Sequence, residues 1–470
     1  MRFVSTRGTA PTLALRDAVL AGLARDGGLY VPQEWPRLST DEWRALRGQP
    51  YGAVAKRVLA PFVAVEIEEA AFGRMVDEAY AAFSHRAVAP LVQVGPDEWV
   101  MELFHGPTLA FKDVAMQLLA RMMDHVLGER GSHATIVGAT SGDTGGAAIE
   151  AFRGRENTDI FILFPHGRVS DVQRLQMTAI RREGADENVH PLAVEGDFDD
   201  CQALVKALFN DLAFRDEMRL SGVNSINWGR IMAQIVYYCT AALALGAPDR
   251  AVSFTVPTGN FGDIFAGLAA KRMGLPVADL VIATNANDIL ARTLGSGRYE
   301  VAGVTATTSP SMDIQVSSNF ERLLFEAGGR DADAVVRAMD SLKQSGAFTV
   351  EGPALEAIRA EFRAGRADEA AVHETIRRTL HETGMLVDPH TAVGLHVAGE
   401  CRGDAPMVTL ATAHPAKFPD AVEAACGVRP PLPPRMGDLM ERAERSTLVP
   451  NDLDALQELI RARSRFPATA

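Results

Sequence analysis

The sequence contains few cysteines, and none of them is spaced like a metal ligand. Its four cysteines, Cys201, Cys239, Cys401 and Cys426, are widely separated and form no CxxC pair. This spacing excludes the common zinc motifs and favours free thiols in a reducing compartment. We therefore predict no bound metal and no disulfide framework.

Positive charge is also scarce, because 47 Lys and Arg face 60 Asp and Glu, which gives a net charge of −13 at pH 7. This balance argues against nucleic acid or an anionic membrane as a partner. A secretory signal is not expected, since the N-terminus carries Arg2, Arg7 and Arg16 without a continuous apolar stretch. The longest uncharged run, residues 231–248, is short for a membrane span and suits a buried helix. We expect a cytoplasmic metabolic enzyme.

Short apolar segments alternate with helical patterns between about residues 130 and 430. The expected strands are residues 160–164, 192–194, 252–256, 280–283 and 407–411. This alternation predicts an α/β fold with parallel sheets flanked by helices. The first 90 residues instead show mainly helical patterns that are broken by prolines.

The last forty residues begin with a proline-rich stretch. Residues 430–434 contain four prolines, which predicts a stiff extended spacer. Leu453, Leu456 and Ile460 then follow at helical spacing, and Asn451 is suited to cap that helix. We therefore predict a spacer and a C-terminal helix.

Lys112 lies where a turn leads into a helix. Residues 104–113 have the sequence FHGPTLAFKD, and apolar residues then recur at helical spacing as far as Val126. On the first helical turn, the helix dipole disfavours an ammonium group and should lower the lysine pKa. A partly desolvated lysine of low pKa forms Schiff bases with carbonyl compounds. The alternative is a solvated lysine at a helix start.

Two glycine-rich turns each follow an apolar strand and precede a helix. The first is residues 139–146 (ATSGDTGG) and the second is residues 257–263 (PTGNFGD). Glycines allow close backbone approach, and free N–H groups at a helix start favour an anion. Neither turn is a Walker loop or a GxGxxG motif, and either alone could be an ordinary strand-to-helix turn. Together with Lys112, they indicate a ligand with two anionic ends and a carbonyl between them, as in pyridoxal phosphate bound to an amino acid.

Further motifs support a family resemblance. They are residues 3–8 (FVSTRG), 22–32 (GLARDGGLYVP), 224–227 (NSIN), 317–322 (SSNFER) and 413–418 (AHPAKF). With these motifs, the chain resembles the threonine synthase family, in the longer form of bacteria and fungi, over nearly its whole length. The resemblance implies the α/β fold of fold-type II pyridoxal-phosphate enzymes, which is related to the tryptophan synthase β subunit.

The resemblance also implies a domain division. Residues 1–92 would form a mainly helical N-terminal domain, and residues 93–127 with 246–429 a large cofactor-binding α/β domain. Residues 128–245 would form a smaller, mobile α/β domain. Residues 430–470 would contribute the spacer and the last helix.

Site roles follow from the same resemblance. Lys112 would bind the cofactor as a Schiff base and then move protons between Cα and Cβ of the substrate. Thr412, after the strand 407–411, would face the pyridine nitrogen, with Thr409 as an alternative. The residues expected to bind the cofactor phosphate are Thr258, Gly259, Asn260, Phe261, Gly262 and Asp263. The residues expected to bind the substrate carboxylate are Thr140, Ser141, Gly142, Asp143 and Thr144.

The substrate phosphate needs a separate site. Asn224, Asn227 and Arg230 precede the apolar run, and an arginine with asparagines suits a phosphate. Asn227 could instead cap the helix. Further phosphate candidates are Arg168, Ser170 and Arg174. His105 and His414 lie beside turns, where a histidine can serve as a general base or make a structural hydrogen bond.

The resemblance implies conversion of O-phospho-L-homoserine and water to L-threonine and phosphate through an aldimine of pyridoxal phosphate. This carbon–oxygen lyase reaction is the last step of threonine biosynthesis. One alternative is another fold-type II lyase, such as a threonine dehydratase or an amino phospholyase. The other alternative is a non-catalytic relative, and the oligomeric state is left open.

Overall fold

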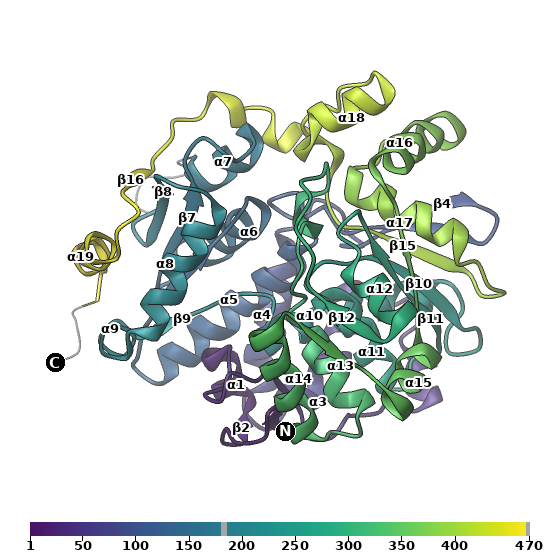
Figure 1. Ribbon diagram of the computed structural model, residues 1–470, viewed down its shortest axis with the longest axis horizontal. Helices are drawn as coiled ribbons and strands as arrows, with labels where there is room; N and C mark the ends of the chain where they lie inside the picture. The colour runs from purple at the N-terminus through teal and green to yellow at the C-terminus, as the bar shows by residue number, and fades with distance from the viewer. Residues whose placement is uncertain (180–185, 467–470) are drawn as a thin grey trace.

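The apolar segments in the middle of the chain form two sheets that lie side by side, each flanked by helices (Figure 1). The computed structural model describes residues 1–179 and 186–466. The first sheet has the strand order β14-β11-β10-β15-β5-β4. Its strands are β4 (Leu91–Gly95), β5 (Glu98–Glu102), β10 (Val252–Pro257), β11 (Val277–Thr284), β14 (Phe362–Arg366) and β15 (Met407–Ala411). All pairs are parallel except β4 with β5.

The second sheet is wholly parallel and has the order β16-β8-β7-β6-β9. Its strands are β6 (Ala134–Ala139), β7 (Thr158–Pro165), β8 (Val189–Val194), β9 (Leu220–Ser221) and β16 (Thr447–Val449). Every residue of β7 and of β10 is buried, which explains their continuous apolar sequences. Each strand expected from the sequence is present, and the predicted α/β architecture is confirmed.

The N-terminal unit is mainly helical but also contains a small antiparallel sheet that the sequence did not predict. The strands β1 (Arg2–Ser5), β2 (Leu13–Ala14) and β3 (Tyr30–Pro32) form it, in the order β2-β1-β3. The helices are α1 (Leu15–Ala21), α2 (Thr40–Ala45), α3 (Tyr51–Val63) and α4 (Glu69–Ala81).

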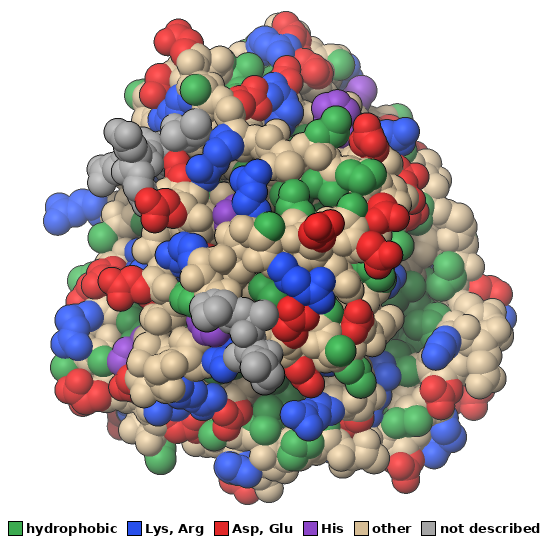
Figure 2. Space-filling model, turned by 90° about the vertical axis from the view of Figure 1, so that its left-hand side faces the viewer, with side chains coloured by type: hydrophobic (Ala, Val, Ile, Leu, Met, Phe, Trp, Pro, Cys, Tyr) green, Lys and Arg blue, Asp and Glu red, His purple; other side chains and the backbone are tan. Residues whose placement is uncertain are grey.

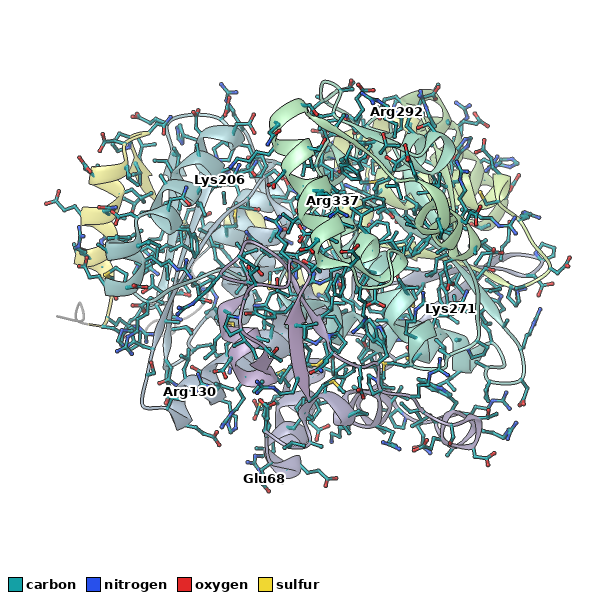
Figure 3. The ribbon with its side chains drawn as sticks, turned by 60° about the horizontal axis from the view of Figure 1, so that its bottom comes forward. Glu68, Arg130, Lys206, Lys271, Arg292 and Arg337 are labelled. Atoms are coloured by element: carbon teal, nitrogen blue, oxygen red, sulfur yellow. The ribbon has the colours of Figure 1, made fainter. Side chains whose placement is uncertain are left out.

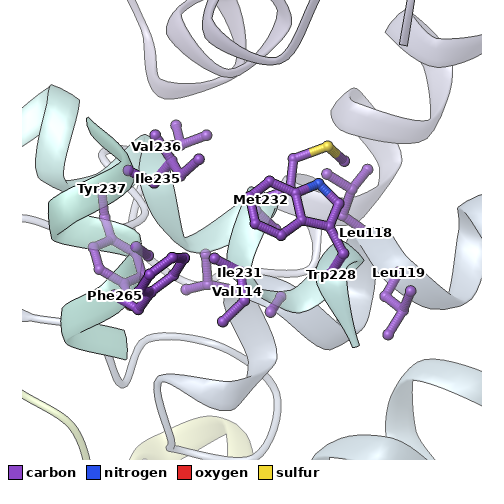
Figure 4. Packing of buried hydrophobic residues seen from close by; sticks show 14 of the residues in the cluster. Val114, Leu118, Leu119, Trp228, Ile231, Met232, Ile235, Val236, Tyr237 and Phe265 are labelled. Atoms are coloured by element: carbon purple, nitrogen blue, oxygen red, sulfur yellow. The ribbon is translucent and has the colours of Figure 1, made fainter. Parts of the chain in front are cut away.

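Helix α10 (Trp228–Ala244) lies at the centre of the molecule. It packs against α3, α5 (Lys112–Glu129) and α11 (Gly262–Arg272). Figure 4 shows side chains of these helices, such as Trp228, Val114 and Phe265, in one cluster. The helix is buried on nearly every side, so the apolar run belongs to the core. Within the described ranges, no helix is long and apolar enough to cross a membrane.

The remaining helices cover the two sheets. The helices around the five-stranded sheet are α6 (Asp143–Phe152), α7 (Asp171–Thr178), α8 (Phe198–Asn210) and α9 (Leu212–Glu217). Those of the six-stranded half are α12 (Ile289–Ser296), α13 (Phe320–Ala327), α14 (Ala332–Ser345), α15 (Gly352–Glu361), α16 (Glu369–Thr383), α17 (Pro389–Glu400) and α18 (Pro419–Cys426). A short antiparallel pair, β12 (Arg298–Glu300) and β13 (Ala347–Thr349), lies beside them.

The C-terminal segment returns to the five-stranded sheet, at the left edge of Figure 1. Strand β16 pairs with β8, and α19 (Leu453–Arg463) packs against α8. The predicted helix is confirmed, but Asp452 caps it in place of Asn451. The strand was not predicted.

Candidate active site

A cavity of about 590 Å³ lies between the two sheets. One wall comes from the start of α6 and from α8, and the other from the start of α11, residues 310–314 and Thr412. This volume suits a cofactor together with a small substrate. Most residues singled out from the sequence line it, namely Lys112, Thr140, Ser141, Asp143, Thr144, Asn224, Arg230, the 258–263 turn and Thr412.

Lys112 is the first residue of α5 and is only 9% exposed. Its Nζ lies 3.5 Å from Oδ2 of Asp143 and 4.8 Å from the ring centroid of Phe111. Burial lowers the pKa of Lys112, and the charges of Lys417 and Arg230 act in the same direction, against Asp143. The direction agrees with the sequence-based prediction, but burial is the largest cause, and a solvated lysine is excluded.

The first glycine turn joins β6 to α6 and is held by Thr140. Its Oγ1 accepts hydrogen bonds of 2.9 Å from the N–H groups of Gly142 and Gly145. Gly142 has a φ of +149°, and a Cβ there would lie 2.4 Å from the Gln173 side chain, so glycine is required. Ser141 is exposed to the cavity, and the first N–H groups of α6 have no partner within the helix. These groups can bind an anion.

The carboxylate of Asp143 is already engaged. Oδ1 lies 2.8 Å from Nζ of Lys417 and accepts a 2.9 Å hydrogen bond from Gln173, while Oδ2 faces Lys112. Burial alone would raise the pKa of Asp143, but the charges of Lys417 and Lys112 hold it well below its usual range. The Asp143 side chain therefore positions Lys112 and Lys417. Because this side chain is itself an anion, only the backbone N–H of Asp143 is suited to bind a substrate carboxylate.

The second glycine turn joins β10 to α11. Gly259 is required because a Cβ there would lie 2.8 Å from the carbonyl oxygen of Ser311. Phe261 has a φ of +63°, and its ring packs against Phe320 in the core, so it offers only its backbone to a ligand. Thr258 donates its hydroxyl to the carbonyl of Val256 at 2.6 Å. The turn thus presents mainly backbone groups to the cavity.

Asp263 lies in the first turn of α11 with an unusual environment. Its Oδ1 accepts hydrogen bonds from the hydroxyls of Tyr237 and Tyr238, the latter at 2.9 Å. Its Oδ2 is buried and has no hydrogen-bond partner. Burial raises the pKa of Asp263 to about 6, although the two tyrosine hydrogen bonds oppose this. Asp263 was expected only as part of a phosphate-binding turn, and its burial beside two tyrosine hydroxyls was not predicted.

Arg230 is a buried cation that lines the cavity. It is 3% exposed, and burial lowers the pKa of its guanidinium to about 10. Its hydrogen bond to the carbonyl of Val223 is long, at 3.4 Å, and its Nε has no partner. Among the described residues, no carboxylate lies within salt-bridge distance of it. Tyr237 and Asp263 favour the charged form of Arg230 without forming an ion pair with it, so its guanidinium can still bind an anionic ligand.

The structure corrects the expectation for Asn227. Its Oδ1 accepts a 2.9 Å hydrogen bond from the N–H of Gly229, and its amide donates to the carbonyl of Val19 at 2.8 Å. The residue is fully buried and does not line the cavity. Asn227 therefore caps α10, whereas Asn224 is exposed to the cavity.

Thr412 lines the cavity, and Thr409, two positions before the end of β15, does not. The two histidines also lie outside the lining: His105 contacts Glu102 at 2.7 Å, and Nδ1 of His414 accepts a hydrogen bond from Ala416. Arg168, Ser170 and Arg174 are likewise absent from the lining; Ser170 caps α7 and Arg174 pairs with Glu444.

Several lining residues were not identified from the sequence. His390 on α17 contacts Asp388 at 2.7 Å through Nδ1, and its Nε2 accepts a 3.2 Å hydrogen bond from the N–H of Ser311. Gln202 and Lys206 on α8 line the opposite wall. The sequence around Gln202 and Lys206 is typical of an exposed helix surface, so nothing in it indicates a binding site. In the part of the chain that is described, no cluster of three or more His, Cys, Asp or Glu is arranged to hold a metal.

Comparison with known families accounts for most of the chain. The family described as "Threonine synthase N terminus" matches residues 2–80, "Pyridoxal-phosphate dependent enzyme" matches residues 85–413, and "Threonine synthase, C-terminal" matches residues 391–460. A threonine synthase of Pseudomonas aeruginosa is 54% identical over 463 residues, which cover 98% of each chain. The chain belongs to the threonine synthase family.

Solved structures of the family agree. The pyridoxal-phosphate-bound threonine synthase of Brucella melitensis has 66% identity and a TM-score of 0.97, covering 99% of this chain and all of its own. The yeast threonine synthase has 36% identity and a TM-score of 0.91, covering 98% of each chain. The predicted fold class, that of fold-type II pyridoxal-phosphate enzymes, is confirmed.

The residues present fit pyridoxal phosphate. A buried lysine of lowered pKa, Lys112, suits its aldehyde. A glycine turn at the start of α11, into which a Cβ would not fit at Gly259, suits its phosphate. Arg230 offers an unpaired charge in the same cavity.

Proposed function

We propose that this chain is a threonine synthase, which converts O-phospho-L-homoserine and water to L-threonine and inorganic phosphate. The observation that supports this most directly is the position of Lys112, which lines one cavity together with both glycine turns and an unpaired arginine. Membership of the threonine synthase family supports the same activity. The reaction would be that of a carbon–oxygen lyase acting on a phosphate, in the cytoplasm.

Three groups would hold the cofactor. Lys112 would bind its carbonyl carbon, the Thr258–Asp263 turn its phosphate, and the Thr412 hydroxyl its pyridine nitrogen. When bound, pyridoxal phosphate withdraws electrons from the substrate and so acidifies its Cα–H. A neutral hydroxyl opposite the ring nitrogen moderates that withdrawal, which suits elimination better than transamination.

The two anionic ends of the substrate would occupy different parts of the cavity. The exposed hydroxyl of Ser141 and the free N–H groups at the start of α6 would bind the carboxylate. Arg230, with the Asn224 amide, would bind the phosphate, because its guanidinium lacks a carboxylate partner. A buried, charge-assisted contact of this kind orients the leaving phosphate at Cγ.

Lys112 would then move the protons. Its lowered pKa keeps a larger share of the amine neutral near pH 7, as a general base requires. The amine would relay protons one at a time: it would take one from Cα and one from Cβ as phosphate leaves Cγ, and it would return one to Cγ. Water would then add its hydroxyl at Cβ, with one proton returned to Cα and the last carried away by the phosphate, which gives L-threonine and hydrogen phosphate. The carboxylate of Asp143, 3.5 Å away, would hold the amine in place during these transfers.

The test is a steady-state assay with O-phospho-L-homoserine that measures threonine and phosphate together. Equimolar release of both supports the proposal. Release of 2-oxobutyrate and phosphate would indicate a related lyase instead, and no turnover would indicate a non-catalytic relative.

Lys112→Ala provides the matched control. The protein should fold, because Asp143 keeps its contact with Lys417, but it should lose turnover and the cofactor label that borohydride fixes on Lys112. A label on Lys417 or Lys271 would contradict the assignment.

A further inference from the structure

Two lysines share one carboxylate at the edge of the cavity. Oδ1 of Asp143 lies 2.8 Å from Nζ of Lys417, and Oδ2 of the same group lies 3.5 Å from Nζ of Lys112. Lys417 does not line the cavity and its side chain is 0% exposed, so it does not touch a ligand there. Lys417 can therefore act on Lys112 through the shared Asp143 carboxylate and through its own charge.

The ammonium group of Lys417 is fully satisfied by protein acceptors. It donates to the carbonyl of Thr108 at 2.8 Å and to Oε1 of Gln176 at 2.9 Å, in addition to its contact with Asp143. Three acceptors match the three donors of an ammonium group, so every donor of this buried side chain is used within the protein. Gln176 also donates to the carbonyl of Thr108, which ties the acceptors to each other.

The contact joins the two halves of the site. Lys417 follows β15 of the six-stranded sheet, whereas Asp143 and Gln176 belong to α6 and α7, which cover the five-stranded sheet. Lys417 thus fixes the start of α6 relative to the cavity wall that contains Thr412.

We propose that Lys417 is a positioning residue for Lys112: it anchors the Asp143 carboxylate, and its fixed charge keeps the Lys112 amine available as a nucleophile and base. A carboxylate that faced Lys112 alone would stabilise the ammonium form of Lys112. Lys417 takes the shorter contact and adds a like charge nearby, which opposes a second cation. The burial of Lys112 and the charge of Lys417 both lower the pKa of Lys112, while Asp143 raises it.

The inference rests on the proposed role of Lys112, but it can be tested by a measurement that does not involve the reaction. Competitive acetylation of the full-length, cofactor-free chain with limiting acetic anhydride, followed by mass spectrometry of the Lys112 peptide, gives the pH midpoint at which this amine becomes reactive. Neither substrate nor cofactor takes part, so the result does not depend on whether threonine is formed.

Lys417→Met removes the charge and keeps the length of the side chain. We expect the Lys112 midpoint to rise by about one pH unit, that is, about tenfold less reaction at a fixed lower pH. Lys417→Arg, which keeps the charge, should stay close to the parent. Lys271→Met is the matched control, because Lys271 pairs with Glu361 away from the cavity, and it should leave the midpoint unchanged.

Asp143→Asn should move the midpoint in the opposite direction, since it removes the group that favours the ammonium form. A folded Lys417→Met protein with an unchanged or lowered midpoint overturns the proposal. Circular dichroism shows whether Lys417→Met folds. If it does not fold, Asp143→Asn is the test, and an unchanged or raised Lys112 midpoint in that variant overturns the proposal. Threonine formation without these shifts would keep the proposed function and reject only the role of Lys417.

Discussion

At the scale of single residues, the proposed site divides recognition of the substrate between Arg230, for the phosphate, and Ser141, for the carboxylate. A charge-assisted hydrogen bond to a phosphate contributes about 1.5–3 kcal/mol, so Arg230→Ala should weaken binding roughly tenfold to a hundredfold. We expect the apparent constants for O-phospho-L-homoserine and for inhibitory phosphate to rise in parallel. Binding of L-serine, which has no phosphate, should change little.

Ser141→Ala provides the comparison, because every amino-acid ligand would present its carboxylate to the start of α6 in the proposed site. It should weaken O-phospho-L-homoserine and L-serine together, while inhibition by phosphate stays close to the parent. If Arg230→Ala weakens L-serine as strongly as O-phospho-L-homoserine, Arg230 binds the cofactor or supports the fold, and the substrate phosphate lies elsewhere.

Asp263 gives the site a pH-dependent stability. Its pKa is about 6 in the folded chain against 3.8 for the ordinary group, so the folded state binds the proton more tightly. The stability associated with this proton is therefore fully present below pH 3.8 and is lost as the pH rises to about 6. The loss amounts to roughly 3 kcal/mol.

Asp263→Asn should remove this loss, because an amide oxygen still accepts from the two tyrosines and carries no charge to bury. Thermal unfolding of the cofactor-free chain should show a stability advantage for Asp263→Asn that grows from pH 3.8 to about 6 and is constant above. Asp113, whose pKa burial also raises to about 6, titrates in both proteins and cancels in the difference. An advantage that does not vary with pH would contradict a buried, titrating carboxyl at this position.

Local sequence predicted those residues whose role depends on near neighbours. Lys112 was identifiable because the turn before it and the helix that it begins are local features of the sequence. The role of Lys417 was not, since its partners Thr108, Asp143 and Gln176 are distant in the sequence and meet only when the two sheets pack. Asn227 was ambiguous for a different reason: the side chain that suits a phosphate also suits a helix cap, and only the distances decide.

The C-terminal segment is the element whose contribution is most readily tested. Leu456 and Ile460 of α19 are fully buried in the apolar cluster that also contains Leu204 and Leu208 of α8. Leu456→Ala should destabilise the protein by about 2–5 kcal/mol through lost burial and a residual cavity. Denaturant unfolding measures this, with the exposed Glu458→Ala on the same helix as the control.

Hydrogen exchange would locate the part of the protein that Leu456→Ala destabilises. The β8 amides, which pair with β16 on one side, should lose protection in Leu456→Ala more than those of β10 in the other sheet. Equal loss in both sheets would show that the chain unfolds as a single unit and that α19 is not a local clamp.

The sequence predicted those strands in which burial on both faces requires a continuous run of apolar residues. Strands such as β7 and β10 are buried on both faces, so their apolar runs are unmistakable. Strand β16 has three residues, of which Val449 alone is buried, and β1 alternates in burial over only four. Strands this short are defined by the partners that they pair with, β8 for β16 and both β2 and β3 for β1, and the local sequence does not describe those partners.

At the scale of the whole molecule, the charge of the chain opposes its proposed substrate. The net charge is −13, and O-phospho-L-homoserine is also an anion. On the face shown in Figure 2, Lys and Arg side chains are interspersed with Asp and Glu. Positive charge that attracts the substrate must therefore be local, at the cavity. Of the Lys and Arg residues that line it, Lys112 and Arg230 are buried and Lys206 is exposed.

Lys206 should accordingly steer the substrate into the cavity. Lys206→Ala should lower kcat/KM for O-phospho-L-homoserine roughly twofold to tenfold at low ionic strength, and the difference should shrink as salt rises, because exposed charges are screened over about 10 Å at 0.1 M salt. Lys271→Ala changes the net charge equally but lies far from Lys206, on α11 in place of α8, as Figure 3 shows. Equal effects of the two substitutions would assign the loss to net charge, and a loss that salt does not relieve would place Lys206 in direct contact with the substrate. If Lys206 steers the substrate, only Lys206→Ala lowers kcat/KM, and this loss becomes smaller as the salt concentration rises.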